Sequence, residues 1–490
     1  MEARASRQTQ RGTEGGAPRL FKTFVSLVGA ELVTRGLVLV TGVVLARALS
    51  APEFGEFSYA FGVAVVAGLL IDLGLASLII RDVSAEPERA PALLAAFLHA
   101  QGLLALGTFG LVTLLTVSGV VGGPASHTSI LIAAAAVCVG AFSRPFEATL
   151  TGRGQAHLVT VSRAVRGLVL AGGTLAVALT EPTVDRFLVV WVFSEAAGVV
   201  AVGLLCIRRS VRPFVAERRG QVGRLLRLAL PFALVTAANV LYTRVDILML
   251  GHMETDAAVG NYGVASRVLE AAIVLPAFFG NAFLATISET GPRTERGRMQ
   301  TTEALGWIVL ITAPLAVTLA VAATPLIDLV TGGGYDEAGP VLQRLSPIVL
   351  VIATYGVLAS LQVALDELGV LLRLFGIGLL VKVAANLYAI PAFGVRGAAV
   401  AATATEILIG AIQWRWARAY FDGRSAAGAI VRVLVAAGVS AAVMALLVDL
   451  LPWGVGVALG LLAYLIAAVA TGALSPARTR EAVAAIRGAA

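Results

Sequence analysis

Residues 21–60 read FKTFVSLVGAELVTRGLVLVTGVVLARALSAPEFGEFSYA. They begin with an apolar segment that is long enough, at about 1.5 Å per residue, to cross a bilayer as a helix. Glu31 and Arg35 lie in the middle of this segment, and Pro52 to Gly55 are expected to form a short turn before a second apolar run. Because a charge at bilayer depth is tolerated mainly when it faces a polar interior or a partner, Arg35 is a candidate functional residue.

The composition extends this reading to the whole chain. Of its 490 residues, 58% are hydrophobic and 14% are charged, with a mean hydropathy of +0.88. Soluble domains are about 45–50% apolar and about 25% charged, so the sequence predicts an all-α polytopic membrane protein. Cys138 and Cys206 are isolated, and we expect no disulfide or metal site. The net charge of +7 does not indicate a nucleic-acid-binding protein, because the basic residues lie between apolar spans.

Apolar periodicity predicts about 14 transmembrane helices. We expect a parallel repeat of two six-helix lobes followed by two extra helices. The predicted parts are a disordered cytoplasmic tail (1–20), an N-lobe (21–207), a basic cytoplasmic linker (208–226), a C-lobe (227–420), and the extra helices with a short cytoplasmic tail (421–490).

The distribution of basic residues predicts the orientation. Most of the 37 Lys and Arg residues fall in loops that are cytoplasmic if the N-terminus is inside. Short loops rich in Lys and Arg stay in the cytoplasm, so we expect both termini there and the protein in the cytoplasmic (inner) membrane. Only four basic residues fall in the outer loops: Arg47, Arg186, Arg344 and Arg396.

An internal repeat supports the two lobes. A shift of 205 residues places LARALSAPEFGEFSYA (45–60) over LGHMETDAAVGNYGVA (250–265), which matches Gly55 with Gly260. Six helices per lobe give both lobes the same orientation, and a substrate site is then expected between them near the membrane midplane.

Three stretches resemble a known family. They are the stretch 21–60, DLGLASLIIRDVS (72–84) and DILMLGHMETDAAVGNYGVASRVLEAAIVLP (246–276). They look like the polysaccharide-transporter and oligosaccharide-flippase branch of the multidrug/oligosaccharidyl-lipid/polysaccharide exporter superfamily. The resemblance implies an alternating-access carrier that moves a polyprenyl-pyrophosphate-linked glycan from the cytoplasmic to the outer leaflet. Fourteen spans also occur in the lipid II flippases of this superfamily, which keeps a lipid II-type cargo open.

Six cations are predicted to lie within the spans, and they are the candidate substrate-binding residues. A pyrophosphate is a compact anion that needs fixed cations in a low-dielectric interior, and the bidentate fork of Arg suits it. Convergence of these cations would make the cavity between the lobes positively charged. They are Arg35, Arg163, Arg166, Arg244, Arg267 and Lys382.

Acidic residues within the spans are candidates for gating or for binding a coupling Na⁺ or H⁺, and we expect no other ligand as a cofactor. Glu31 with Arg35 (i,i+4) and Arg267 with Glu270 (i,i+3) could instead form neutralising pairs within a helix. Ordinary helix–helix hydrogen bonds are the alternative for the rest. The candidates are Glu31, Asp72, Asp246 and Glu270, and Glu195 and Glu406 also lie within spans.

Missing motifs limit the chemistry. The two lysines, Lys22 and Lys382, do not follow a GxxxxG loop, and HExxH and GxSxG are absent, so we expect neither an enzyme nor an ATPase. A membrane potential that is negative inside, worth about 2.3 kcal/mol per charge per 100 mV, favours an anion moving outward.

A cation-coupled multidrug antiporter and a non-transporting scaffold are the rival functions. Expected partners are the lipid-linked glycan, membrane lipids, and a glycan polymerase or glycosyltransferases, around a monomer that binds no nucleic acid.

Overall fold

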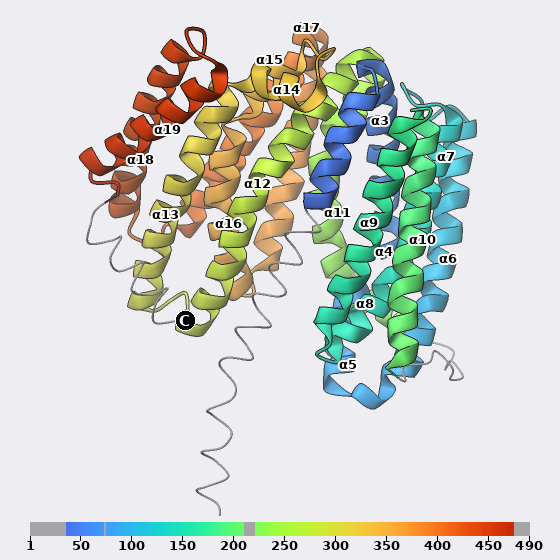
Figure 1. Cartoon of the computed structure of the whole chain (residues 1–490). Coiled ribbons are helices and arrows are strands. Elements are labelled where there is room, and N and C mark those ends of the chain that lie inside the picture. Colours follow the sequence, from blue (N-terminus) through green and yellow to red (C-terminus); the bar gives the residue numbers. More distant parts are fainter. Residues whose placement is uncertain (1–35, 73–74, 210–220, 475–490) are drawn as a thin grey trace, which may run out of the picture.

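The computed structural model describes residues 36–72, 75–209 and 221–474, and every regular element in these ranges is helical (Figure 1). A helix over Gly36–Ala48 comes first. It is followed by α3 (Ala51–Ala67), α4 (Leu69–Asp72), α5 (Leu75–Ala85), the 3-10 helix η1 (Pro87–Arg89), α6 (Ala90–Val117), α7 (His127–Ala141), α8 (Ser143–Gly152), α9 (Ala156–Leu179), α10 (Val184–Arg208), α11 (Gln221–Met253), α12 (Asp256–Thr290), α13 (Glu295–Val321), α14 (Ala323–Thr331), α15 (Ala338–Leu345), α16 (Ile348–Ala364), α17 (Leu368–Ala417), α18 (Gly423–Leu447) and α19 (Trp453–Ala470).

The described residues contain twelve helical segments that are long and apolar enough to cross a membrane. The prediction of an all-α, multi-pass membrane protein is therefore confirmed. At about 1.5 Å per residue, the 50 residues of α17 would span more than twice a hydrocarbon core of about 30 Å if the helix were straight. Gly394 breaks it, with φ of 61° and ψ of −147°, so that α17 consists of two helices joined at a kink. The total of fourteen spans stays a prediction.

The turn expected at Pro52 to Gly55 is wrong, because these residues form the start of α3. Ser50 caps the helix through a capping box, in which Glu53 Oε2 accepts hydrogen bonds from the Ser50 backbone N (2.8 Å) and Oγ (2.7 Å). Proline is tolerated in a first turn, where its missing N–H has no partner to lose. The apolar run therefore continues directly from the cap.

The helices form two bundles, an N-terminal bundle (α3–α10) and a C-terminal bundle (α11–α17), with α18 and α19 packed beside α13. In Figure 1 the bundles converge at the upper end, where α14 and α15 lie, and α12, α13 and α16 diverge from the N-terminal bundle towards the lower end, where α5 and α8 lie. Helix α11 contacts α4, α5 and α6 as well as α3. One buried apolar cluster contains residues of both bundles, among them Phe54, Leu250 and Leu342. The two bundles are thus joined by a shared core at the upper end.

Two glycines allow α3 and α12 to approach closely at this junction. A Cβ on Gly55 would collide with the carbonyl of Asp256, and a Cβ on Gly260 would collide with the carbonyl of Ala51. Small residues permit such close contacts between membrane helices. The pair that the internal repeat aligned therefore lies face to face across the two bundles.

Candidate functional site

Two guanidiniums share one carboxylate at the junction of the bundles. Arg244 of α11 donates a hydrogen bond from Nη1 to Glu270 Oε1 (3.0 Å), and Arg267 of α12 donates one from Nη1 to Glu270 Oε2 (3.3 Å). Their side chains are 24% and 31% exposed, and that of Glu270 is 43% exposed. Arg267 and Glu270 form the pair that their i,i+3 spacing allowed as an alternative, and Glu270 also takes a second cation. Among the described residues, this group of three side chains carries a net charge of one positive unit.

An aromatic ring of the N-terminal bundle faces this pair. The centroid of Phe61, on α3, lies 4.5 Å from Arg267 Cζ and 5.5 Å from Arg244 Cζ. Both distances are within the range in which a ring attracts a cation through its quadrupole. The rings of Phe61 and Trp191 lie 5.0 Å apart, so α3 and α10 both reach this point.

Trp191 connects the pair to a further cation of the N-terminal bundle. Its Nε1 donates a hydrogen bond to Glu195 Oε1 (3.1 Å), while Arg166 Nη1 donates one to Glu195 Oε2 (3.2 Å). Arg166 is therefore paired with Glu195, an acidic residue that the sequence had placed within a span. Candidate cations of both bundles are connected through Glu195, Trp191 and Phe61.

The depth of these residues follows from helix geometry. At about 1.5 Å per residue from the upper helix ends, Phe61, Arg244 and Arg267 lie about 14–17 Å inside α3, α11 and α12. That is roughly half of a hydrocarbon core of about 30 Å. The charged pair lies near the middle of the membrane, where an ionised group has a functional or a pairing role.

Of the remaining candidates in the N-terminal half, Arg163 is paired with a glutamate of α8. Its side chain is 44% exposed and donates to Glu147 Oε2 (2.8 Å). Glu31 and Arg35 lie outside the described residues, and Asp72 ends α4. Their assignments stay predictions.

Lys382 and Asp246 form a separate cluster inside the C-terminal bundle. Lys382 Nζ lies 3.0 Å from Asp246 Oδ2, and the two side chains are only 4% and 6% exposed. Asn386 Nδ2 donates to Asp246 Oδ1 (2.8 Å), and the Tyr262 hydroxyl donates to Asp246 Oδ2 (3.1 Å). The structure does not place Lys382 beside the two guanidiniums, because this network holds it between α11 and α17.

A second carboxylate completes this inner cluster. Glu406, 6% exposed, is close enough to Lys382, Asp246 and Tyr242 for them to act on its carboxyl group. Asn386 is fully buried, and its Oδ1 has no hydrogen-bond partner among the residues that the structure describes. Among the described residues, the cluster thus contains one ammonium, two carboxylates and an amide oxygen, Asn386 Oδ1, without a hydrogen-bond partner. This arrangement can take up a proton or a small cation.

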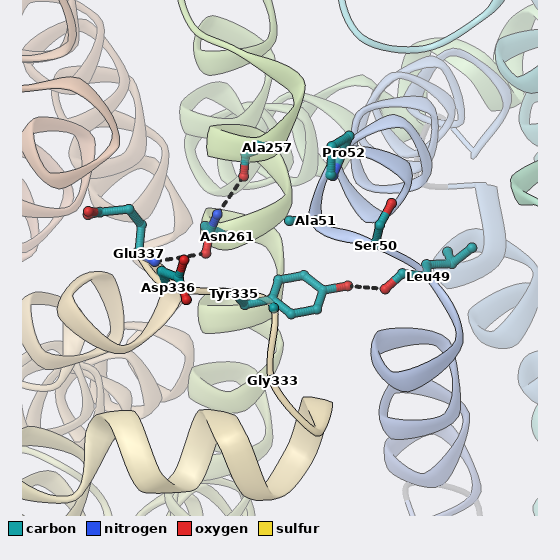
Figure 2. Close-up of a pocket in the computed structure, with 11 residues that line it drawn as sticks. Leu49, Ser50, Ala51, Pro52, Ala257, Asn261, Gly333, Tyr335, Asp336 and Glu337 are labelled. Carbon is teal, nitrogen blue, oxygen red and sulfur yellow. Dashed lines mark hydrogen bonds between the residues drawn. The ribbon is translucent and has the colours of Figure 1, made fainter.

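Contacts between distant segments close the upper end. The Tyr335 hydroxyl, in the connection between α14 and α15, donates to the Leu49 carbonyl (2.8 Å), as Figure 2 shows. Arg47 Nη2 donates to the Leu329 carbonyl (2.7 Å). Three successive glycines with positive φ, Gly332–Gly334, let the chain turn before Tyr335. These contacts join residues on opposite sides of the junction.

A surface ion pair lies next to them. Arg396 donates from Nε and Nη2 to the carboxylate of Glu337 (2.6 and 2.7 Å), and these hydrogen bonds hold the pKa of Glu337 below its usual range. The Glu337 backbone N donates to Asn261 Oδ1 (3.1 Å). A pocket of about 430 Å³ opens here, and its walls include Leu49, Pro52, Ala257, Asn261, Tyr335 and Asp336 (Figure 2).

Sequence reasoning did not identify Phe61, Trp191, Tyr242, Tyr262 or Asn386. One available signal was spacing, since Tyr242 precedes Asp246 by four residues and Asn386 follows Lys382 by four, which places each pair on one helix face. Trp191 likewise precedes Glu195 by four residues on α10. Phe61 offered no such signal, because the two guanidiniums and the Trp191 ring that it contacts lie on other helices.

The fold and these charges define the chain as a multi-pass membrane protein with ionised side chains inside its helical bundles. A family model described as polysaccharide biosynthesis protein matches residues 20–290. This is more than half of the sequence, so the chain belongs to that family. No curated protein sequence matches the chain.

Solved structures support the fold assignment. A lipid II flippase, MurJ, in an inward closed conformation has a TM-score of 0.74 at 15% identity, over 91% of this chain and 98% of that one. An inward-facing multidrug resistance transporter of the MATE family has a TM-score of 0.63 at 14% identity, over 78% and 93%. A superfamily transporter from Pyrococcus furiosus, described as having a binding pocket of reverse polarity, has a TM-score of 0.57 at 15% identity, over 80% and 93%. At these identities the likeness concerns the fold alone.

Proposed function

We propose that this chain is a flippase that carries a polyprenyl-pyrophosphate-linked oligosaccharide from the cytoplasmic to the outer leaflet by alternating access, without hydrolysing ATP. The observation that carries the proposal is the pair of guanidiniums, Arg244 and Arg267, which share the single carboxylate of Glu270 near the membrane midplane. A surplus cation at that depth needs an anionic partner. The pyrophosphate of a lipid-linked glycan supplies one.

The hydrogen-bonding capacity of the pair agrees with this cargo. A guanidinium has five N–H donors, and each of the two uses one of them on Glu270 among the described residues. The other donors are available for phosphate oxygens, which Arg binds through two parallel hydrogen bonds. A cationic drug would meet a net positive charge here, which argues against the multidrug antiporter. A scaffold would have no use for a surplus cation inside the membrane.

The orientation follows from the charged ends of the helices. Arg153, Arg208 and Arg293 lie at lower helix ends, whereas Arg186 and Arg396 lie near the upper end. By the positive-inside rule the lower end is cytoplasmic, so the bundles are joined on the outer side and the cargo enters from the cytoplasm. Glycosyltransferases or a glycan polymerase in the same membrane would supply or consume it, and the carrier acts as a monomer in the inner membrane.

The inner cluster is the proposed site of coupling to an ion. Asp246 and Glu406 together carry one more negative charge than Lys382 neutralises, and an uncompensated buried carboxylate is costly. A proton or Na⁺ would balance that charge, and its release would favour a different arrangement of α11 and α17. The energy for transport would then come from an ion gradient together with the membrane potential.

The flippase is tested with Arg244 variants reconstituted into vesicles that contain a fluorescent polyprenyl-pyrophosphate glycan. We expect Arg244→Ala to lose at least about nine-tenths of the flipping rate, since a hydrogen bond to a charged group is worth about 1.5–3 kcal/mol, and Arg244→Lys to retain part of it. Arg186→Ala, which breaks the exposed ion pair with Glu181, is the control and should flip normally. Undiminished flipping by Arg244→Ala would refute the assignment.

Lipid II is the second candidate cargo, because the alignment with the lipid II flippase covers 98% of that chain and extends further along this one than the others reported. The same vesicles loaded with lipid II distinguish the two cargoes. Faster transport of lipid II than of the oligosaccharide probe would select it.

A further inference from the structure

Phe61 contacts the two guanidiniums from the opposite bundle. It belongs to α3 of the N-terminal bundle, whereas Arg244 and Arg267 belong to α11 and α12 of the C-terminal bundle. The contact therefore exists only while the two bundles are packed as they are here. Its strength depends on the arrangement of the bundles and not on either bundle alone.

Resting on the proposed function, we propose that Phe61 is a positioning residue that orders the guanidiniums of Arg244 and Arg267 for phosphate binding only while the bundles are joined at the upper end. The affinity of the site for the pyrophosphate then changes with the conformation of the carrier. The site binds its cargo in this state and loses affinity when the bundles move apart there.

The geometry of a cation on a ring suits this role. An aromatic ring attracts the guanidinium through its face, while the N–H donors project from the edges of the guanidinium plane. Stacking against Phe61 thus leaves those edges free for phosphate oxygens and reduces the number of orientations that the side chain samples. The ring also offsets part of the repulsion between two cations that share the carboxylate of Glu270 among the described residues.

The ring itself is fixed by its own bundle. The Phe61 and Phe57 rings stack with a 19° angle between their planes and 6.2 Å between their centroids, and Trp191 lies against Phe61. Trp191 is in turn held by its hydrogen bond to Glu195. The glycine contact between α3 and α12 fixes the separation of the two helices about one and a half to two turns above. Movement of either bundle would therefore displace the ring from the guanidiniums.

A carrier needs an affinity for its cargo that differs between its two conformations. A ligand shifts a conformational equilibrium only by its difference in affinity for the two states, and cargo that is bound equally tightly in both would not be released. Phe61 supplies a difference of this kind, since the guanidiniums keep their charge in both states but are ordered only in one.

The test measures binding of farnesyl pyrophosphate to the purified full-length protein. We expect Phe61→Leu to bind it roughly 3- to 30-fold more weakly, as the loss of a cation–π contact predicts, and Phe61→Tyr to stay within about 2-fold of the wild type. Phe193→Leu, the same change at an exposed site on α10, is the matched control and should bind normally. Binding of farnesol, which lacks phosphate, should not change in any variant.

A second arm separates positioning from a general loss of structure. In an Arg267→Gln background, Phe61→Leu should cause little or none of the loss that it causes in the wild type, because the group that it orders is gone. An equal loss in both backgrounds, or unchanged affinity of Phe61→Leu, would overturn the inference while leaving the flippase intact. Failure of the wild type to bind farnesyl pyrophosphate would instead overturn the proposed function. Phe61→Met replaces Phe61→Leu if the latter does not fold.

Discussion

The two charged clusters of this protein contain the same kinds of groups in opposite balance. At the junction of the bundles, Arg244 and Arg267 share Glu270, and all three side chains are 24–43% exposed. Inside the C-terminal bundle, Lys382 faces Asp246 and Glu406, all about 4–6% exposed. The first cluster is accessible and has a surplus cation, whereas the second is enclosed and has a surplus carboxylate.

The difference shows how one membrane fold can use charge in two ways. A partly exposed pair of guanidiniums keeps free donors and can exchange its partner for a ligand. A buried ammonium held by Asp246 cannot be released without leaving an unpaired charge in a low-dielectric interior. We therefore propose that the junction binds the cargo and that the inner cluster contributes stability and coupling.

The largest effect is expected when the cation of the inner cluster is removed. Lys382→Met leaves two buried carboxylates without a counter-charge, and we expect it to lower the free energy of unfolding by roughly 3–5 kcal/mol. The double change Lys382→Met with Asp246→Asn should recover most of that loss. Arg267→Met, at the exposed cluster, should cost well under half as much. Thermal unfolding in detergent measures all three, and equal losses from the two single changes would contradict the distinction.

The next test acts on the contact that brings the bundles together. Gly260→Ala places a Cβ against the Ala51 carbonyl, and such overpacking should destabilise the fold by about 1–3 kcal/mol. It should also weaken binding of farnesyl pyrophosphate, because the α3–α12 contact above Phe61 is forced open. Gly172→Ala on α9 is the control, since a Cβ there meets no described atom within 4 Å. If Gly260→Ala bound the probe normally, affinity would not depend on the joined upper end.

The same carboxylate-to-amide change should act oppositely in the two clusters. Glu270→Gln removes the internal competitor for the two guanidiniums, so farnesyl pyrophosphate should bind a few-fold more tightly with little change in stability. Asp246→Asn should destabilise the protein and leave affinity nearly unchanged, because the site of binding is elsewhere. Isothermal titration combined with thermal unfolding measures both. Weaker binding by Glu270→Gln would show that Glu270 positions the pair more than it competes for it.

The smallest effect is expected at the surface of the upper end, where Glu337 and Arg396 form their ion pair. Arg396 holds the pKa of Glu337 in the folded protein below its usual value of 4.5. The ion pair therefore stabilises the fold at pH values above the pKa that Glu337 has in the unfolded chain. This contribution is lost as the pH falls through the lower pKa that Glu337 has in the folded protein. The melting temperature of Glu337→Gln should therefore lie slightly below that of the wild type near pH 7 and match it in strong acid. A difference that grew on acidification would have the wrong sign.

The sequence was sufficient for properties that are set locally along the chain. Hydrophobicity, the spacing of apolar runs and the position of basic loops gave the membrane class, the helices and the depth of the charges, because each depends on residues close in sequence. The repeat aligned Gly55 with Gly260, and the i,i+3 spacing paired Arg267 with Glu270. The turn expected at Pro52 failed because Ser50 and Glu53 form a cap that continues the apolar run as a helix.

Only the tertiary structure decided which charge meets which partner. The sequence predicted six cations within the spans without showing their partners. In the structure Arg244 and Arg267 share a carboxylate beside Phe61, Arg166 pairs with Glu195, and Lys382 is enclosed with Asp246. Helical periodicity fixes the face on which a side chain lies, but the rotation and neighbours of each helix come from packing across the whole bundle. The sequence of each span therefore determines how far along the helix a charge lies, whereas the ion-pair partner of that charge is set by helices far apart in the chain.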